Sequence, residues 1–125
     1  MTLLAELRHK LQAMTDRRFD AVICDIDGCL APESSAPIDA ATLAKLAAHN
    51  QLAQERRDRP VITVCSGRPL PFAEAMCRLL GNQTLPLIAE NGVWMYHPQN
   101  NRYDRDPSIT SAHLKAVQEV QEWVE

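Results

Sequence analysis

The sequence lacks the features that bring a protein to nucleic acid or into a membrane. Its 125 residues carry a formal net charge of −3, so no broad basic surface favours a nucleic acid partner. No apolar run approaches the roughly 20 residues of a bilayer-crossing helix. The first residues, MTLLAELRHKLQAMTDRR, interrupt their apolar positions with charges and so lack a signal-peptide core. We expect a cytoplasmic protein with no nucleic acid and no membrane partner. The composition implies no particular oligomeric state.

Three missing motifs exclude further classes of site. No Gly-Lys pair occurs anywhere, which excludes a P-loop nucleotide binder. The four histidines form no H-E-x-x-H motif, so a zinc hydrolase of that kind is excluded too. None of the four cysteines forms a C-x-x-C pair, and reduced thiols are therefore a simpler interpretation than a disulfide framework or a zinc site. These cysteines are Cys24, Cys29, Cys65 and Cys77.

What is present is an ordinary globular mixture with alternating helical and strand-like patterns. Hydrophobic residues make up 46% and charged residues 23%, and the length suits one domain. Helical spacing of apolar residues marks four segments: residues 3–14, the stretch after Asp39, residues 69–81, and the stretch after Ser108 or Thr110. Short apolar runs indicate buried strands at residues 21–24, 61–65 and 85–89. Alternation of this kind predicts an α/β protein with a parallel sheet flanked by helices.

The end of the pattern departs from this alternation. Asn91-Gly92 signals a tight hairpin that leads into the strand-like segment VWMY. Residues 97–105 are polar and we predict a loop there. Ligand sites in parallel sheets lie at the carboxyl ends of the strands. Because Asp25, Ser66 and Glu90-Asn91 all fall at or just past strand ends, we expect them to converge on one crevice.

The segment AVICDIDGCL carries the most chemical information. Asp25 and Asp27 lie two residues apart at the end of an apolar strand and can face one site, and Gly28 permits a tight turn. Two carboxylates at such a short separation repel each other unless a cation lies between them or one of them keeps its proton. A carboxylate can attack phosphorus, and a protonated neighbour can supply the leaving alcohol with a proton. Taken alone, Asp-x-Asp-Gly is explained equally well by a turn in which Asp bonds to its own backbone.

Two later segments repeat the form of an apolar strand followed by small polar residues. In VITVCSGRP, Ser66 can donate to a phosphate oxygen, and Gly67 lets backbone N–H groups approach an anion. Arg68 can bind a substrate anion or brace the loop through an ion pair. The alternative for this segment is a strand-to-helix turn with Ser66 as the helix cap. In LIAENGVWMY, a plain Asn-Gly hairpin is as good an explanation as any functional role.

The three segments, taken together and in order, resemble the motifs of the haloacid dehalogenase-like (HAD) superfamily. AVICDIDGCL resembles the first motif, a hydrophobic strand followed by Asp-x-Asp-Gly-Thr/Cys-Leu, and VITVCSGRP resembles the second in its Ser/Thr-Gly-Arg form. LIAENGV resembles the Ile-x-Glu-Asn-Gly stretch of the branch with Cof-type sugar phosphatases, whose cap domain is inserted after the second motif. The resemblance implies a Rossmann-like, three-layer α/β/α core with a mostly parallel sheet, present here in part.

The resemblance also implies roles for individual residues. Asp25 would be the nucleophile and a magnesium ligand, and Asp27 the general acid/base, which also gives its backbone carbonyl to the metal. Ser66 and Gly67 would bind the transferring phosphoryl group. Arg68 and Asn91 would support the site or the substrate. The implied function is Mg²⁺-dependent hydrolysis of a small phosphorylated metabolite, by family default a sugar phosphate, through an aspartyl-phosphate.

Two elements of the family pattern are not found in this sequence. The pattern needs a lysine that balances phosphoryl charge and a later pair of acids that holds Mg²⁺. After Ser66 the one lysine is Lys115, in a helical stretch, and we interpret it, with Asp104 and Asp106, as a surface charge. We therefore expect residues 1–97 to form the first part of the core, residues 98–125 to begin the cap, and the pattern to continue beyond them. On that expectation the 125 residues alone would be weakly active or inactive.

Two other classes of protein remain as alternatives. A response-regulator receiver also has about 120 residues of alternating α/β structure and paired acids after its first strand. Its phosphorylated Asp lies at the end of the third strand, whereas this sequence has Glu90-Asn91 there. A catalytically inactive HAD-like binding module is favoured by the missing lysine and disfavoured by the presence of both Asp25 and Asp27.

Overall fold

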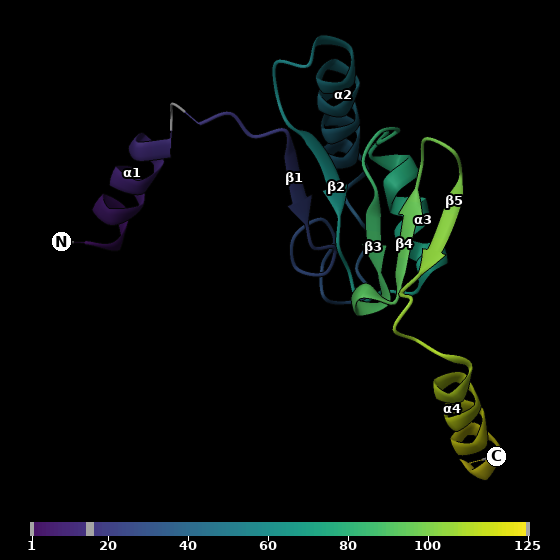
Figure 1. Cartoon of the computed structure of the whole chain (residues 1–125). Coiled ribbons are helices and arrows are strands. Elements are labelled where there is room, and N and C mark those ends of the chain that lie inside the picture. The colour runs from purple at the N-terminus through teal and green to yellow at the C-terminus, as the bar shows by residue number, and fades with distance from the viewer. Residues whose placement is uncertain (1, 15–16, 125) are drawn as a thin grey trace.

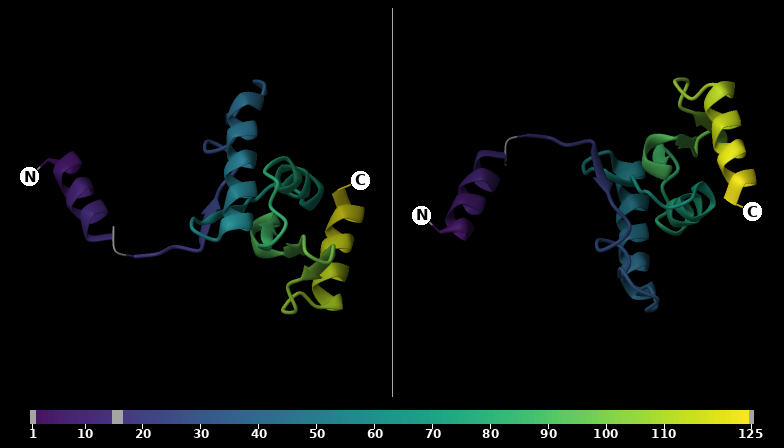
Figure 2. Two further views of the ribbon diagram at one scale, coloured as in Figure 1. Left: turned by 90° about the horizontal axis from the view of Figure 1, so that it is seen from above. Right: turned by 90° about the horizontal axis from the view of Figure 1, so that it is seen from below.

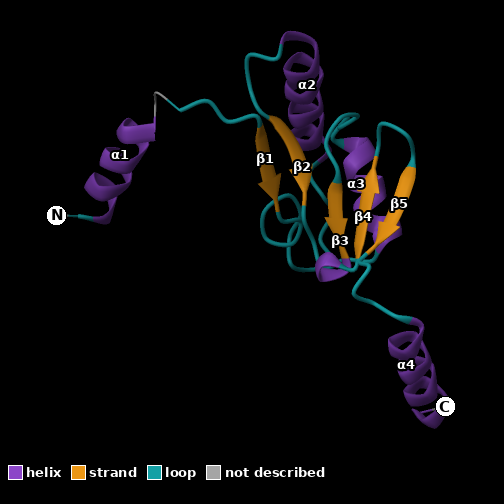
Figure 3. Cartoon of the chain, in the orientation of Figure 1, coloured by secondary structure: helices purple, strands orange, loops and turns teal. Residues whose placement is uncertain are grey.

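The computed structural model describes residues 2–14 and 17–124, and its elements follow the predicted alternation (Figures 1 and 3). In chain order they are α1 (Leu3–Met14), β1 (Ala21–Cys24), α2 (Ala40–Arg56), β2 (Val61–Val64), α3 (Leu70–Leu79), β3 (Leu87–Ala89), the 3₁₀ turn η1 (Glu90–Gly92), β4 (Trp94–His97), β5 (Arg102–Arg105) and α4 (Ser111–Val124). Every helix and strand that the pattern predicted is present, and each predicted end lies within two residues of the observed one.

The strands lie side by side in the order β1-β2-β3-β4-β5. β1 and β2 are parallel, with Cys24 opposite Val64, and a parallel bridge between Cys65 and Ile88 joins β2 to β3. β4 then pairs antiparallel with β3 on one side and with β5 on the other. The predicted α/β class with a parallel sheet is therefore confirmed, and the parallel part is β1 to β3.

Helices α2 and α3 cover one face of this sheet, behind the strands in the view of Figure 1. Their inward residues form the core with β2, β3 and β4; its least exposed members are Ile26, Val64, Ala73, Cys77, Leu80, Leu87 and Ala89. A buried amide ties the two helices to the sheet. Asn50 of α2 donates to the carbonyls of Ile62 and Leu80 and accepts from the Ile62 N–H. The crossovers from β1 to β2 and from β2 to β3 thus pass on the same side.

The ends of α2 and α3 follow from local chemistry. The Asp39 carboxylate caps α2 by accepting from the Ala41 N–H at 3.1 Å, and α2 ends where Arg57 takes a left-handed conformation with φ of 55°. α3 begins after Pro69, contains Pro71 in its first turn, and ends at Leu79, with Leu80 as the cap residue before Gly81 (φ of 64°). Both observations agree with the predicted helical segments, one starting after Asp39 and the other covering residues 69–81.

Three details of the sequence prediction were wrong. Residues 97–105 are not simply a loop, because Arg102–Arg105 forms β5 and pairs with β4 across a polar turn. The hairpin at Asn91-Gly92 is not a two-residue turn, since Ala89 pairs with Trp94 and a 3₁₀ turn fills the space between them.

The third detail is β1, which was predicted to be buried. Its residues are mostly exposed; Ile23 is 63% exposed. The reason is that β1 is the edge strand among the described residues, with β2 alone beside it.

α1 stands away from the sheet in Figures 1 and 2, and α4 lies below the sheet in Figure 1. All described residues of α1 and α4 are exposed, including their apolar stripes, which contain Leu3, Leu4, Leu7, Leu11 and Met14 in α1 and Leu114, Val117, Val120 and Val124 in α4. No helix in the described ranges is both long enough and apolar enough to cross a membrane. The division into a core and a cap stays a prediction. The predicted boundary at residues 97/98 falls inside the β4–β5 hairpin.

Candidate functional site

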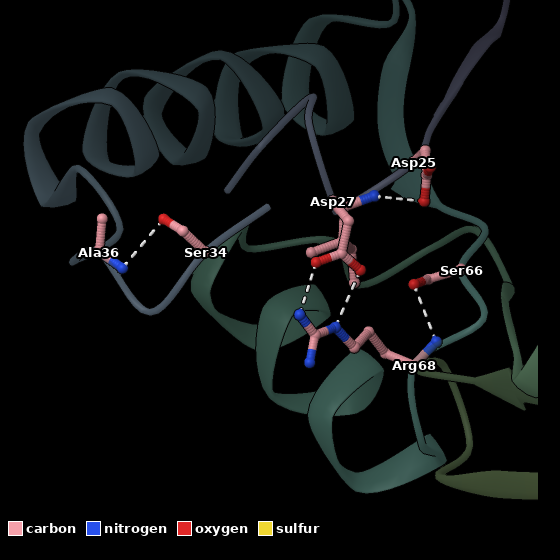
Figure 4. A network of polar contacts seen from close by, with 7 residues as sticks. Asp25, Asp27, Ser34, Ala36, Ser66 and Arg68 are labelled. Atoms are coloured by element: carbon pink, nitrogen blue, oxygen red, sulfur yellow. Dashed lines mark hydrogen bonds and ion pairs between the residues drawn. The ribbon is translucent and has the colours of Figure 1, made fainter. Parts of the chain in front are cut away.

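The register of the parallel strands brings the predicted polar groups to one edge of the sheet. The Cys65 N–H donates to the Cys24 carbonyl at 2.9 Å. Asp25 directly follows Cys24 and Ser66 directly follows Cys65, so both lie where the two parallel strands end. The Ser66 N–H donates to the Ile88 carbonyl at 3.0 Å, which brings the end of β3 to the same place. Figure 4 shows Asp25, Asp27, Ser66 and Arg68 gathered at these strand ends.

Asp25 has an exposed side chain held in a fixed position. Its Oδ1 accepts from the Ile26 N–H at 2.7 Å, and the Ile26 side chain is fully buried in the core. The other oxygen, Oδ2, makes no hydrogen bond with the described residues. One carboxylate oxygen is therefore oriented by the backbone while the other stays available to a ligand.

The segment after Asp25 is also a turn, as the alternative interpretation required. The Ile26 carbonyl accepts from the N–H groups of Cys29, Leu30 and Ala31, and Gly28 has a φ of 76°. A Cβ at Gly28 would lie 3.0 Å from Glu33 Oε1. The turn and the site are therefore compatible, because the turn is what holds the two acids at the strand end.

Asp27 is engaged by Arg68 in a two-point ion pair. Arg68 Nε donates to Oδ2 at 2.8 Å and Nη2 donates to Oδ1 at 2.6 Å, while the guanidinium lies 5.1 Å from the ring centroid of Phe72. Hydrogen bonding to Arg68, helped by its charge and opposed by partial desolvation, lowers the pKa of Asp27. Of the two roles that the sequence left open for Arg68, the structure shows the ion pair.

Ser66 and Gly67 form a tight loop between β2 and α3. Ser66 is 4% exposed, and its Oγ accepts from the Arg68 N–H at 3.1 Å, so its own hydroxyl hydrogen remains to be donated. Gly67 is required by space, because a Cβ there would lie 2.9 Å from Asn91 Oδ1. Asn91 itself donates its backbone N–H to the Ser66 carbonyl at 3.3 Å. Asn91 is therefore placed against the loop, as a supporting residue would be.

One residue of this site escaped the sequence prediction. Glu90 was noted as lying at a strand end but was given no role. Its carboxylate accepts from the Leu70 N–H at 3.2 Å, at the start of α3. The available signal was the cap position itself: Pro69 has no side-chain acceptor, so the start of α3 needs a partner from elsewhere.

The described residues supply only part of the ligand set of a metal ion. No group of three or more His, Cys, Asp or Glu side chains gathers within residues 2–14 and 17–124. Asp25 offers a free carboxylate oxygen, but both oxygens of Asp27 are bound to Arg68. An all-oxygen set of this kind suits Mg²⁺, which needs few protein ligands and keeps several waters. The residues fit part of a magnesium site, with Asp25 as its side-chain ligand.

The three charged residues that we interpreted as surface charges lie away from this site. Lys115 pairs with Glu119 along α4 at 3.8 Å, and Asp104 pairs with Arg102 on β5 at 2.8 Å. Asp106 accepts from the Ser108 N–H in the linker before α4. Since each has a local partner away from Asp25, the structure gives none of them a place in the site.

No protein-family model and no curated protein matches the chain. Among solved structures, it is similar to a haloacid dehalogenase-like hydrolase from Bacteroides thetaiotaomicron, with a TM-score of 0.62 and 15% identity over 82% of this chain and 36% of that one. It is also similar to Thermoplasma acidophilum 0175, with a TM-score of 0.58 and 19% identity over 85% of this chain and 43% of that one. The chain thus has a HAD-like fold and spans less than half the length of either structure.

Proposed function

We propose that this chain carries the nucleophile half of a Mg²⁺-dependent phosphatase that hydrolyses a small phosphorylated metabolite. The supporting observation is the convergence of Asp25, with one free carboxylate oxygen, and Ser66, with a hydroxyl hydrogen to donate, at two adjacent parallel strand ends. A similar fold in a haloacid dehalogenase-like hydrolase agrees with this assignment. A sugar phosphate is the substrate class that the motif resemblance favours.

In the proposed reaction Asp25 is the nucleophile. Its Oδ2 attacks phosphorus, the bond to the ester oxygen breaks, and the leaving alkoxide takes a proton from Asp27. Water then attacks the aspartyl-phosphate, Asp27 accepts its proton, and Asp25 and inorganic phosphate are released. The Ser66 hydroxyl and the N–H of Gly67 hold the phosphoryl oxygens throughout.

Magnesium would be held by Asp25 and by the backbone carbonyl of Asp27. When bound, it would supply positive charge against the phosphoryl oxygens. The lysine and the further acids of the family pattern would come from residues beyond this sequence, as would most of the cap that starts near residue 98.

The Asp27–Arg68 pair sets a condition on this scheme. A general acid must hold a proton, but the Arg68 guanidinium lowers the pKa of Asp27 and keeps it a carboxylate. Arg68 must therefore release Asp27 before the first step. A phosphate dianion is a strong competitor for a guanidinium, so substrate binding itself can move Arg68 from Asp27 to the phosphoryl group.

The direct test is Mg²⁺-dependent hydrolysis of a generic phosphate ester by a version of the protein that includes the downstream reading frame. Asp25→Asn should lower kcat by at least about 10³-fold, since it removes the nucleophile. Asp58→Asn, an exposed acid paired with Arg59, is the matched control and should leave the rate unchanged.

Other results would favour the two alternative classes. Full activity in Asp25→Asn would remove the nucleophile assignment. Stable transfer of phosphate from acetyl phosphate to the chain, without turnover, would favour the receiver. Binding of phosphate without any hydrolysis by the longer protein would favour the inactive module.

A further inference from the structure

The loop that would hold phosphate is held in place by the end of β3 and the residues that follow it. Four hydrogen bonds join the two segments. The Ser66 N–H donates to the Ile88 carbonyl, and the Asn91 N–H donates to the Ser66 carbonyl. The Glu90 N–H donates to the Arg68 carbonyl at 3.2 Å, and the Glu90 carboxylate accepts from the Leu70 N–H at the same distance.

Glu90 is the one residue in this set that holds the loop at two points. Its backbone binds the loop in the middle, and its side chain binds the place where the loop becomes α3. The cap residue Pro69 has no side-chain acceptor, and Pro71 has no N–H, so the Leu70 N–H depends on a partner from outside the helix. A carboxylate at a helix N-terminus is also favoured by the helix dipole.

The backbone at this point is bent in a way that side chains rarely adopt. Glu90 and Asn91 have φ values of 52° and 55°, both in the left-handed region. Two adjacent non-glycine residues in that region persist only where surrounding contacts hold them. The contacts that hold this pair are those to Ser66, Arg68 and Leu70, so the bend and the loop fix each other.

We propose that Glu90 is a positioning residue for the phosphoryl group, acting through the Ser66–Leu70 loop and not by contact with the substrate. Its carboxylate occupies the N-terminus of α3, so an incoming anion meets the Ser66 hydroxyl and the Gly67 N–H instead of the end of the helix. This inference rests on the proposed phosphatase function, which assigns the loop to phosphate.

The test measures binding of inorganic phosphate, in the presence of Mg²⁺, to the chain labelled with ¹⁵N, by following the backbone amide signals of Ser66, Gly67 and Arg68. E90Q keeps an oxygen acceptor for the Leu70 N–H and should bind within about twofold of wild type. E90A and E90D lose the acceptor or its reach, and should bind about tenfold more weakly.

E90D also serves if E90A fails to fold, because Asp keeps the charge and tolerates the left-handed conformation better than Ala. E74A is the control, since it removes the Glu74–Arg78 pair from the same helix without touching its N-terminus. It should bind phosphate as wild type does. Weak binding in E90D together with normal binding in E90Q separates a need for the hydrogen bond from a need for the charge or for general stability.

The outcomes separate this inference from the function it rests on. E90A and E90D that bind phosphate as tightly as wild type would overturn the positioning role, and so would phosphate that shifts none of the three amide signals in wild type. If instead phosphate binding depends on Glu90 as described but the longer protein hydrolyses no ester, the proposed function fails and the positioning role stands.

Discussion

Single polar residues decide how the helices of this molecule are attached to its sheet. Asn50 is completely buried and makes three hydrogen bonds to backbone groups of β2 and α3. Asn50→Ala leaves all three backbone groups without that partner, and we expect the free energy of unfolding to fall by about 3 kcal/mol. Urea denaturation measures this. Gln51→Ala, next along α2 and exposed, should change it by less than about 0.5 kcal/mol. Equal effects of the two substitutions would contradict the attachment role.

The cysteines differ in reactivity for reasons of burial. Cys77 is 1% exposed, and desolvation raises the pKa of its thiol to about 11. Cys29 is exposed at the turn after Asp27. Since the thiolate is the reactive form, iodoacetamide at pH 8 should modify Cys29 at least about 100-fold faster than Cys77. Peptide mass spectrometry follows both sites in one sample.

A Cys29→Ser variant shows whether the fast phase belongs to that residue. Rapid labelling of Cys77 in the native chain would mean that the core beneath α3 opens readily, contrary to its packing.

At this scale the sequence predicted which residues meet but not how they bond. The apolar runs and the strand order were enough to bring Asp25, Asp27 and Ser66 together, because parallel strands end at one edge. The Asp27–Arg68 pair joins positions 41 residues apart. Whether Arg68 pairs with Asp27 or binds a substrate anion depends on the distance between the two side chains in the fold, which the sequence does not give. Glu90 was missed because the sequence around Pro69 shows that α3 lacks a side-chain cap of its own, but not which distant side chain supplies one.

At the scale of secondary structure, helix α2 is capped by a titratable residue, Asp39. The Asp39 side chain accepts from the Thr42 hydroxyl and from the Ala41 N–H, and these bonds lower the pKa of its carboxyl below the usual value of about 3.9. A lowered folded-state pKa contributes stability that is present above the unfolded value and is lost as the pH falls through the folded one. The affected window therefore begins near pH 4 and extends below it.

Comparison of two substitutions tests this cap. Asp39→Ala should lower the melting temperature by a few degrees at pH 7. Asp39→Asn keeps an acceptor but cannot titrate, so any advantage of wild type over it should shrink as the pH falls below 4. Thermal melts of the three proteins between pH 7 and pH 3 measure both effects. An advantage that is constant with pH would show that the charge of Asp39 does not contribute to the cap.

The strands show where an element-level prediction fails. An apolar run such as AVIC is typical of a strand covered on both sides, but how many neighbours it has depends on segments elsewhere in the chain. Among the described residues β1 has one neighbouring strand, so Ile23 stays 63% exposed. β5 was missed for the opposite reason. Its sequence, RYDR, is polar because the strand is mostly exposed, and only its pairing with β4 makes it a strand.

The whole molecule divides into a packed part and two helices without packing. The core residues among the described ones lie in the sheet, in α2 and α3, and in the segments that join them, whereas all described residues of α1 and α4 are exposed. Short helices gain most of their stability from packing an apolar face, and isolated helices shorter than about 12 to 15 residues are marginal in water. α1 has 12 residues and α4 has 14, so both should open with a free energy near zero.

Hydrogen exchange at the level of peptides tests this division. In dilute solution, amides of residues 3–14 and 111–124 should exchange at least about 100-fold faster than those of residues 61–65 and 76–80. Protein concentration is a second variable in this experiment, because a helix with an apolar stripe becomes stable when another surface covers that stripe. If protection of α1 or α4 rises with protein concentration, a second copy of the chain covers the stripe. Strong protection that is independent of concentration would mean that the helix packs within its own chain, which would contradict the arrangement in Figure 1.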